Sequence, residues 1–542
     1  MSGFVSIDQN CTSLWDCIPK LACLAAHGKV GRHFIEDVDV AFTLRGGAAL
    51  PPDAPPDLAR ERFYRGGVSD WGAALFYTDL LGRNPLDIQE LAPFTGWSTA
   101  ALSRRLGFDM DEMYAEFSTS DNHQMVGPSY TADSHYHRTI ADIRVDEVVA
   151  PLRRLWDHAR SDCLERVPER AARDRTNRWF EAERGRVDAW LDECAGGRLP
   201  DLYERWMKHH CPHTPIKRTS ELFALTERSG GRGTVLGEFL RNYEATAGLY
   251  NQAIEDTQSS QYPLELAQGD LPFAVILERG GRWLRGNLRL HEGRLHAEAD
   301  AWPLGADASL PVSRMWDDGV RAVVGKALVL VLQVRAGVGG APLALPNHGS
   351  QYMPTAGRFE ELLASESAAA QEVQPVWRIK VGFPEQLAGC GTMVRLPGYL
   401  QRAFGAVELP ADELARRFRD VRARATADLH QARTENGRQV LLGQWAPDLV
   451  RRRDELNNRR RELGRNPETR AQAGDLWEDV KALDAQILRV LAERLVETLH
   501  VSRLDFWDSR GALLPWAVAL GGEKLYNRLI ERAEIVAETY SC

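Results

Sequence analysis

The chain lacks the features that mark membrane-spanning and secreted proteins. It has only eight cysteines in 542 residues, and Cys11, Cys17 and Cys23 lie six residues apart, which fits no zinc signature. The most apolar stretch, Ala327–Val334, is far too short to span a bilayer, and the first residues carry no basic segment of an export signal. We therefore expect a cytoplasmic protein with reduced thiols and no membrane contact.

Lysine is also scarce, and the excess charge is negative. Only eight of the 67 basic residues are lysines, and the net charge at pH 7 is −9. Such a charge argues against a surface built to neutralise nucleic-acid phosphates. The hydrophobic content of 44% and the charged content of 26% are those of a globular chain. The length predicts roughly three domains.

Hydrophobic patterns predict an α/β fold with a large helical content. Amphipathic helices are expected over 145–260, and a β-meander with glycine at each turn over 273–299. Val320–Val334 is predicted to be helical, with a buried strand over 327–334 as the alternative. Nearer the N-terminus, the patterns favour a helix near Cys11–His27, an extended run near Val38–Leu44 and mostly helix over 68–118.

Changes in pattern divide the chain into four regions. They are an N-terminal α/β or helical region, a helical connector, an α/β domain with the meander, and a helical C-terminal region, over 1–165, 166–265, 266–410 and 411–542. The third region contains a strand–helix–strand unit, with strands at Pro342–Pro346 and Val376–Val381. Such units build parallel sheets, and we expect a Rossmann-like body.

A helical hairpin is expected over 447–500. Leu449, Leu456 and Leu463 repeat every seven residues, and apolar residues resume with gaps of four and three after a break at Gly464–Pro467. This pattern predicts two antiparallel helices packed as a coiled coil. Residues 448–465 carry a net charge of +3 and residues 475–497 carry −3, which favours pairing of the two arms over self-association.

The turn inside the strand–helix–strand unit is one candidate site. Asn347-His348-Gly349-Ser350 follows the first strand, and ligands of parallel sheets bind at the carboxyl ends of strands. Backbone N–H groups at the start of the next helix would face an anion. We predict His348 as a catalytic residue and Asn347 and Ser350 as substrate contacts. The alternative is a purely structural turn.

A long polar loop, Ser118–Tyr130, is the second candidate. Asp121 and His123 are predicted to be a catalytic acid–base pair, with Tyr130 contacting substrate. No Gly-x-Ser-x-Gly motif accompanies them, so a serine hydrolase is unsupported. We expect this loop to lie within about 10 Å of the 347–350 turn, because an active site gathers polar groups from distant segments. A surface loop without a role is the alternative.

Histidine is concentrated in one part of the chain. Seven of the fourteen histidines lie between His123 and His213, and six of them, all except His158, fall near the two ends of this span. His135 and His137 would share one face of an extended segment and are candidate metal ligands. The segment His209-His210-Cys211-Pro212-His213 holds four further candidate ligands. The alternative is that these are surface histidines with ordinary hydrogen bonds.

The segment 98–116 has the outline of a helix-turn-helix. Its second helix presents Asp109, Asp111, Glu112 and Glu116. Acidic side chains would repel phosphates, whereas a recognition helix offers basic or amide groups to the bases. We interpret the segment as a structural helix pair.

The order of parts and one short motif resemble the cysteine-adding enzyme family of bacillithiol biosynthesis. His123-Gln124, followed by Gly127-Pro128-Ser129-Tyr130-Thr131, is similar to that family's Gly-Gln-Gln and Gly-Pro-x-Tyr-Thr. The resemblance implies a nucleotidyltransferase-like Rossmann body that binds a nucleotide or another anionic substrate and forms an amide on an amino compound. It marks Gln124, Gly127 and Tyr130 as substrate-binding. Asn122 and His123 depart from the family pattern, which leaves the amino compound open.

These observations lead to one expected function and two alternatives. We expect a cytoplasmic biosynthetic enzyme of the ligase or transferase type, which joins an amine or amino acid to a small-molecule acid, with a nucleotide as the candidate cofactor. The first alternative is a scaffold whose hairpin docks a partner or a second copy of the chain. The second is a nucleic-acid-binding regulator using residues 98–116.

Overall fold

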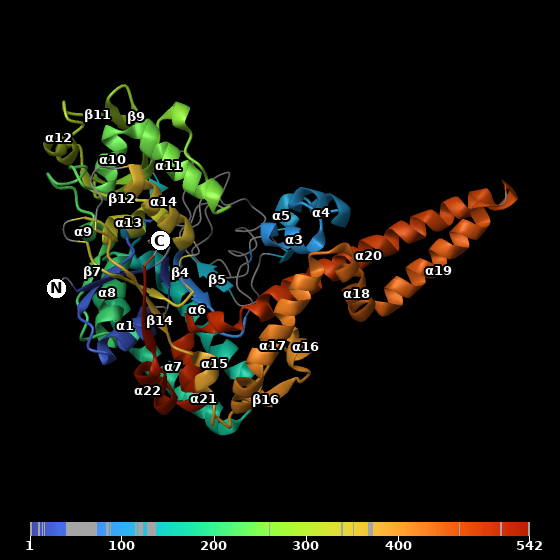
Figure 1. Cartoon of the computed structure of the whole chain (residues 1–542). Helices are drawn as coiled ribbons and strands as arrows, with labels where there is room; N and C mark the ends of the chain where they lie inside the picture. The colour runs from blue at the N-terminus through green and yellow to red at the C-terminus, as the bar shows by residue number, and fades with distance from the viewer. Residues whose placement is uncertain are drawn as a thin grey trace.

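The computed structural model shows a mixed α/β protein with a two-lobed body and a projecting helical arm (Figure 1). The upper lobe carries α10, α11 and the strands β9, β11 and β12, and the lower lobe carries α1, α7, α21 and α22. The structure describes residues 3–8, 11–13, 15, 17–39, 73–82, 86, 88–113, 116–117, 123–126, 137–259, 261–337, 340–348, 350, 352–366, 372–465, 467–509 and 512–539. No helix within these ranges is long and apolar enough to cross a membrane.

A six-stranded sheet forms the centre of the body. Its strand order is β17-β14-β13-β1-β3-β7, and every neighbouring pair is parallel except β14 with β17. The chain builds β1, β3 and β7 on one side of the sheet and then β13, β14 and β17 on the other. The topology therefore switches between β1 and β13. The strands are β1 (Phe4–Ile7), β3 (Gly31–Ile35), β7 (Ile216–Arg218), β13 (Leu343–Pro346), β14 (Val376–Lys380) and β17 (Glu534–Glu538).

The predicted strand–helix–strand unit is confirmed. Strands β13 and β14 are parallel, with Leu343 opposite Val376, and α14 (Met353–Glu366) connects them. The apolar stretch before Asn347 is buried in the sheet. The polar turn therefore starts at the carboxyl edge of the sheet, as the pattern indicated.

The predicted meander forms most of a second sheet, in the order β11-β10-β9-β8-β12. Gly280 and Gly281 make its first turn with φ of 55° and 75°, which glycine adopts without strain. The two-residue strand β6 pairs with β9. The strands are β6 (His137–Arg138), β8 (Asp270–Arg279), β9 (Arg282–His291), β10 (Arg294–Ala297), β11 (Asp300–Pro303) and β12 (Val320–Gly325).

The helix predicted over Val320–Val334 is wrong in its first part. Residues Val320–Gly325 form strand β12, and only Ala327–Arg335 form a helix, α13. The apolar spacing over 320–324 is compatible with either period. Pairing with β8, a neighbour some fifty residues earlier in the chain, decides for the strand.

Two expectations for the N-terminal region are also corrected. The helix expected from Cys11 begins only at Cys17, because Cys11–Ser13 form strand β2. Within the segment expected to be helical, Ala73–Thr78 form strand β4, which pairs with β2 and with β5 (His123–Val126). The extended run expected near Val38–Leu44 lies outside the described residues beyond Asp39, and strand β3, which precedes it, was not predicted.

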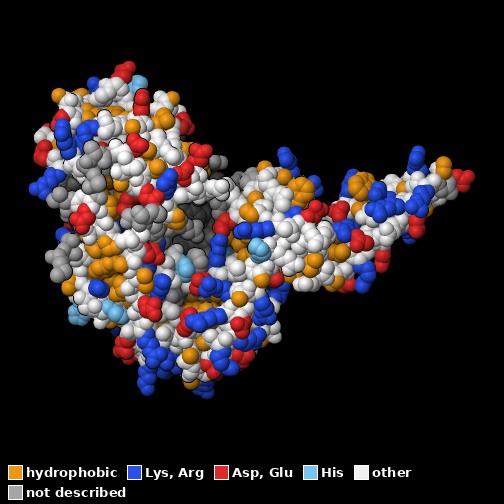
Figure 2. Space-filling model, in the orientation of Figure 1, with side chains coloured by type: hydrophobic (Ala, Val, Ile, Leu, Met, Phe, Trp, Pro, Cys, Tyr) orange, Lys and Arg blue, Asp and Glu red, His pale blue; other side chains and the backbone are white. Residues whose placement is uncertain are grey.

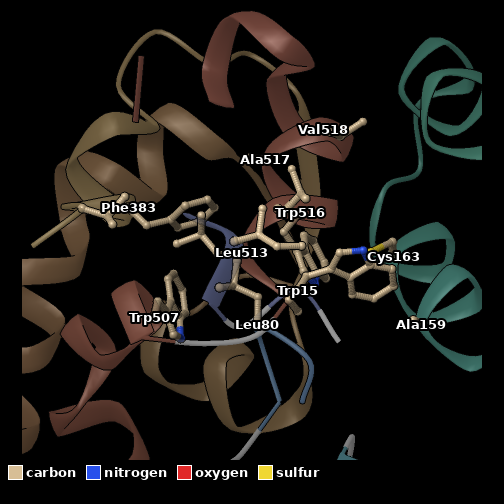
Figure 3. Packing of buried hydrophobic residues seen from close by; sticks show 14 of the residues in the cluster. Trp15, Leu80, Ala159, Cys163, Phe383, Trp507, Leu513, Trp516, Ala517 and Val518 are labelled. Carbon is tan, nitrogen blue, oxygen red and sulfur yellow. The ribbon is translucent and has the colours of Figure 1, made fainter. Parts of the chain in front are cut away.

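The helices expected over 145–260 are confirmed, and those over 145–210 help to bury the largest core of the body (Figure 3). Trp15, Trp516 and Phe383 are buried in this core, and the indole N–H of Trp516 donates to Asp79 Oδ1 at 2.6 Å. The helices of this region are α6 (Val145–Arg166), α7 (Arg170–Glu193), α8 (Leu199–His210), α9 (Thr219–Leu222), α10 (Val235–Arg241) and α11 (Tyr243–Asp256).

Shorter elements complete the body. Strands β15 (Met393–Arg395) and β16 (Glu408–Pro410) pair with each other. The remaining helices of the body are α1 (Cys17–Ala26), α12 (Val312–Asp317), α15 (Phe383–Gln386), α16 (Gly398–Phe404), α21 (Leu513–Gly521) and α22 (Glu523–Arg532), and the 3-10 turns are η3 (Ile140–Asp142), η4 (Leu266–Gln268) and η6 (Leu504–Ser509).

The arm contains the predicted hairpin. Helices α19 (Pro447–Gly464) and α20 (Arg470–Ser502) lie side by side and turn through η5 (Pro467–Thr469), close to the predicted break (Figure 1). Helices α17 (Ala411–Ala432) and α18 (Glu435–Trp445) form the base of the arm. The leucines of α19 are half-buried, and α20 becomes buried from Val480 onward.

The helix pair over 98–116 packs on the arm. The Ser98 hydroxyl accepts from the backbone N–H of Ala101 and caps α4 (Thr99–Leu106). Leu102, Met113 and Phe117 are buried in one core with α20. The neighbouring elements are η1 (Ile88–Leu91), α3 (Ala92–Thr95) and α5 (Met110–Met113). This packing supports the structural interpretation of the segment.

Candidate functional site

Polar residues gather at the carboxyl edge of the six-stranded sheet. Asp8 directly follows β1, the turn 36–39 follows β3, Thr219 follows β7, and Asn347 follows β13. Because these strands are parallel, their carboxyl ends meet at one edge, on both sides of the switch between β1 and β13. Side chains from distant segments therefore come together where ligands of such sheets bind.

His348 lies in the turn between β13 and α14 and contacts two distant elements. Its Nε2 is 3.4 Å from Asp505 Oδ2 of η6, and Arg422 of α17 lies 2.9 Å from the same oxygen. The Asn347 amide nitrogen is 2.9 Å from His348 Nε2. The turn thus joins the sheet edge to the base of the arm through a linked cation–carboxylate–imidazole group.

The pKa of His348 is lowered from its ordinary value. Burial is the main cause, the positive charges of Arg378, Arg422 and Lys380 act in the same direction, and Asp505 acts against them. The neutral imidazole therefore predominates near pH 7, and it can accept a proton.

Arg378 fixes the strand end from which this turn departs. It is buried in β14, pairs with Glu538 at 2.8 Å, and donates from Nη1 to the Pro346 carbonyl at 3.3 Å. Beyond the turn, Ser350 is buried with φ of 62° and bonds to the Tyr352 side chain. Burial raises the pKa of Tyr352, and the nearby Glu36 carboxyl adds to the rise. Tyr352 is therefore a neutral group within electrostatic reach of the β3 turn.

The turn after β3 concentrates carboxyl groups. Glu36 accepts from the backbone N–H groups of Val38 and Asp39 at 2.9 and 3.0 Å. Burial raises the pKa of Glu36 to about 8, and Asp39 and Asp37 contribute. Burial likewise raises the pKa of Asp37 to about 6, although it accepts from the Ser220 N–H and hydroxyl at 2.8 and 2.6 Å. A cationic ligand would relieve this crowding of buried acids.

A second, fully buried group lies beneath the end of β1. The Cys17 thiol donates to Asp8 Oδ1 at 2.7 Å, and His33 Nε2 is 3.3 Å from the same oxygen. The Ser6 hydroxyl is 3.0 Å from His33 Nδ1. Burial acts to raise the pKa of Asp8, but His33 and the thiol outweigh it and hold the pKa below its ordinary value.

The structure tests the two predicted loops unequally. Asn347, His348 and Ser350 lie at the carboxyl edge, as predicted. Asp121, Gly127, Tyr130 and His135 lie outside the described residues. His123 and Gln124 belong to β5, opposite Thr78 and Tyr77 of β4, and only their backbone is described. A shared pocket of the two loops stays a prediction.

The histidine-rich segment after α8 divides between two places. His210 Nε2 lies 3.0 Å from Glu183 Oε2, and His209 packs 5.4 Å from the Trp190 ring. Cys211 instead points into the core near Asp8, and burial raises its pKa to about 12. The four candidates of this segment therefore do not share one place, although ligand atoms of His209 and His210 lie within 4.8 Å of each other and of Glu183.

His137 is half-buried on β6, opposite Arg285 of β9. It belongs to no group of three or more potential metal ligands within the part of the chain that the structure describes. Because His135 lies outside that part, the metal site predicted at His135 and His137 stays a prediction.

Several groups at this edge were missed from the sequence. Asp8, His33 and Glu36 were not singled out, because the strands that carry them were not predicted. A local signal exists: Asp8 and Glu36 each directly follow a short strand that ends in an isoleucine, and His33 lies within the second of these strands. Asp505 and Arg422 carry no such signal, since only tertiary contact brings them to His348.

Comparisons with models of known protein families, with curated proteins and with solved structures found no match. The chemistry of the site therefore has to be inferred from its own geometry.

Proposed function

We propose that the chain is a biosynthetic enzyme of the ligase or transferase type, which joins an amine or amino acid to a small-molecule acid. The active site would be the carboxyl edge of a Rossmann-like body. The observation that carries the proposal is the His348–Asp505 pair in the strand-to-helix turn, with Arg422 beside it. Groups of opposite charge flank this turn, as two unlike substrates require.

His348 is suited to act as the base. Amide formation from a nucleotide-activated acid makes a C–N bond and breaks the bond between the acyl carbon and the phosphate oxygen. The phosphate-bearing group leaves, and the amine nitrogen releases a proton. An imidazole of lowered pKa, paired with a carboxylate, can accept that proton. In this proposal Asp505 orients the ring and stabilises the imidazolium that forms.

The flanking charges match the two substrates. Arg422 and Lys380 place positive charge around His348 and favour an anionic acid or a nucleotide-activated form of it. The buried acids of the 36–39 turn favour an ammonium group. Tyr352 lies within electrostatic reach of both Glu36 and Arg378. Activation by a nucleotide rests on the family resemblance.

The test is a product screen. Purified full-length chain is incubated with isotope-labelled amino acids, a set of hydroxy and sugar acids, and ATP, and new condensation products are sought by mass spectrometry. We expect His348→Gln to reduce product formation by about 100-fold or more, while His213→Gln, in an exposed position, retains it. An unchanged rate in His348→Gln would exclude this residue as the base.

The scaffold alternative is favoured by one observation, the projection of the hairpin away from the body (Figure 1). Arg453 and Asp484 lie 4.0 Å apart across the two helices, so a loop of about four residues could join them and remove the tip. The enzyme proposal expects the shortened chain to keep full product formation. A scaffold would keep its fold and lose its function.

A further inference from the structure

Three segments bring potential metal ligands together beneath the carboxyl end of β1. Asp8 follows β1, His33 lies in β3, and Cys17 is the first residue of α1. Ser6 is the register partner of His33, and side chains alternate along a strand. Ser6, Asp8 and His33 therefore share one face of the sheet, and Cys17 meets them there.

The geometry of these side chains is that of a ligand set. One ligand atom from each of Asp8, Cys17 and His33 lies within 4.8 Å of the other two. Their exposed fractions are 4%, 2% and 0%. A compact, dry group of a carboxylate, a thiol and an imidazole is uncommon in a core that is otherwise apolar.

Two atoms of the group make no hydrogen bond of normal geometry, although His33 Nε2 lies at an ion-pair distance of 3.3 Å from Asp8 Oδ1. Among the residues that the structure describes, Asp8 Oδ2 and His33 Nε2 are buried without one. Buried polar atoms are almost always satisfied, so an unsatisfied pair at one place calls for a missing partner. A bound cation would supply it for both atoms.

The hydrogen bond between Ser6 and His33 is also compatible with a bound cation. With a cation bound, the Ser6 oxygen would accept from His33 Nδ1–H, and the lone pair of Nε2 would bind the cation in place of the contact with Asp8 Oδ1. A hydrogen bond at the second ring nitrogen commonly orients a metal-binding histidine. The position of the ring proton of His33, on Nδ1, is thus assigned from the partner that Ser6 provides.

We propose that Asp8, Cys17 and His33 bind one zinc ion at the carboxyl end of β1. Imidazole nitrogen, thiolate sulfur and carboxylate oxygen are all zinc ligands, and three protein ligands leave a fourth position for water or a substrate group. Cys17 gives up its thiol proton on binding, because the thiolate is the ligand. The site lies next to the topological switch of the sheet and is distinct from the His348 turn.

One alternative is a buried hydrogen-bonded network without metal. Lys20, also buried, adds positive charge near Asp8 and could balance its carboxylate. Another metal-like group, Glu183 with His209 and His210, is less suitable, because Arg186 already pairs with Glu183. Metal analysis of variants in each group distinguishes these two alternatives from the proposed site.

The experiment uses the untagged full-length chain. After equilibration with Zn²⁺ and gel filtration, we expect about one zinc per chain by elemental analysis. Cys17→Ala and His33→Ala should lose the metal. The matched controls Cys23→Ala, a buried thiol on the same helix, and His210→Ala, in the other group, should retain it.

A spectroscopic measurement keeps the test independent of variant folding. Wild-type chain loaded with Co²⁺ should show a thiolate-to-cobalt charge-transfer band and the intense visible bands of a tetrahedral site, and Asp8→Asn should weaken them. A wild-type chain that retains no zinc after equilibration and shows no such bands with Co²⁺ would overturn the proposal. So would zinc that stays in folded Cys17→Ala but leaves His210→Ala. Neither result bears on His348 or on product formation.

Discussion

The body and the arm are stabilised in different ways. In the body, the central sheet joins strands from Phe4 to Glu538, and its largest core joins buried side chains from near both ends of the chain, from Phe4 to Ala533. In the arm, α19 and α20 are consecutive and contact mainly each other toward the tip, and α19 has no fully buried residue. The contrast shows that side chains able to bind ligands or transfer protons gather where distant segments meet. A local hairpin mainly extends the molecule away from the body.

Surface charge separates the two regions as well. On the face shown in Figure 2, positive and negative side chains are intermixed along the arm. The partly or wholly buried acids and the histidines of the candidate site lie in the body, at the sheet edge. Substitutions should therefore lower the free energy of unfolding strongly in the body and only weakly toward the tip of the arm.

The largest expected effect is in the body core. Trp516→Ala removes a fully buried indole and leaves Asp79 without its donor, so unfolding should become easier by about 3–5 kcal/mol. Trp477→Ala on the arm, where the ring is 40% exposed, should cost less than about 1 kcal/mol. Urea denaturation of both variants measures the difference. Equal costs would break the contrast between the two regions.

The second comparison lies within the arm itself. Leu483 is 6% exposed and packs at the inner part of α20, whereas Leu456 is only half-buried. Leu483→Asp should cost about 3 kcal/mol by placing an unpaired charge in the seam, and Leu456→Asp about 1 kcal/mol. The heptad pattern alone predicts several kcal/mol for both. Thermal unfolding monitored by circular dichroism distinguishes the two expectations.

The third prediction concerns pH and Asp37. Burial raises the pKa of Asp37 in the folded chain to about 6, above its ordinary 3.8. The folded state therefore keeps a proton that the unfolded state loses. The resulting stability is fully present below about pH 4 and is lost as the pH rises through 6. Between these limits the loss is about 1–3 kcal/mol.

Asp37→Asn should remove this dependence. The amide keeps a partner for the Ser220 N–H and hydroxyl, while Arg218 and Glu221 remain as the neighbouring charges. The measurement is the difference in unfolding free energy between wild type and variant across pH 4–7. A constant difference would show that the carboxyl is ionised in the fold throughout this range.

The smallest effect is expected toward the tip of the arm. Arg453 and Asp484 form a loose pair at 4.0 Å, with the carboxylate half exposed. A double-mutant cycle with Arg453→Ala and Asp484→Ala should give a coupling of no more than about 0.5 kcal/mol, reduced further by salt. A coupling above about 2 kcal/mol would mean that the arm is held as firmly as the body.

Part of the candidate site was predictable. The turn holding Asn347, His348 and Ser350 was placed at a sheet edge because an apolar strand, a polar turn and a helical pattern follow each other within a few residues. Its partners Asp505 and Arg422 lie far away in the chain, on elements whose own patterns say nothing of His348. The succession of elements along the chain predicts one segment of the site, and tertiary packing determines which distant residues join it.

Short-range patterns in the sequence are enough to define the elements whose partners are neighbours in the chain. The meander of β8–β10, the β13–α14–β14 unit and the α19–α20 hairpin follow from repeats and turns that act over a few residues. Only the tertiary structure decided that Val320–Gly325 and Ala73–Thr78 are strands, because their hydrogen bonds go to distant segments. The meeting of Asp8, Cys17 and His33 has the same cause, since strand register sets which side chains face each other.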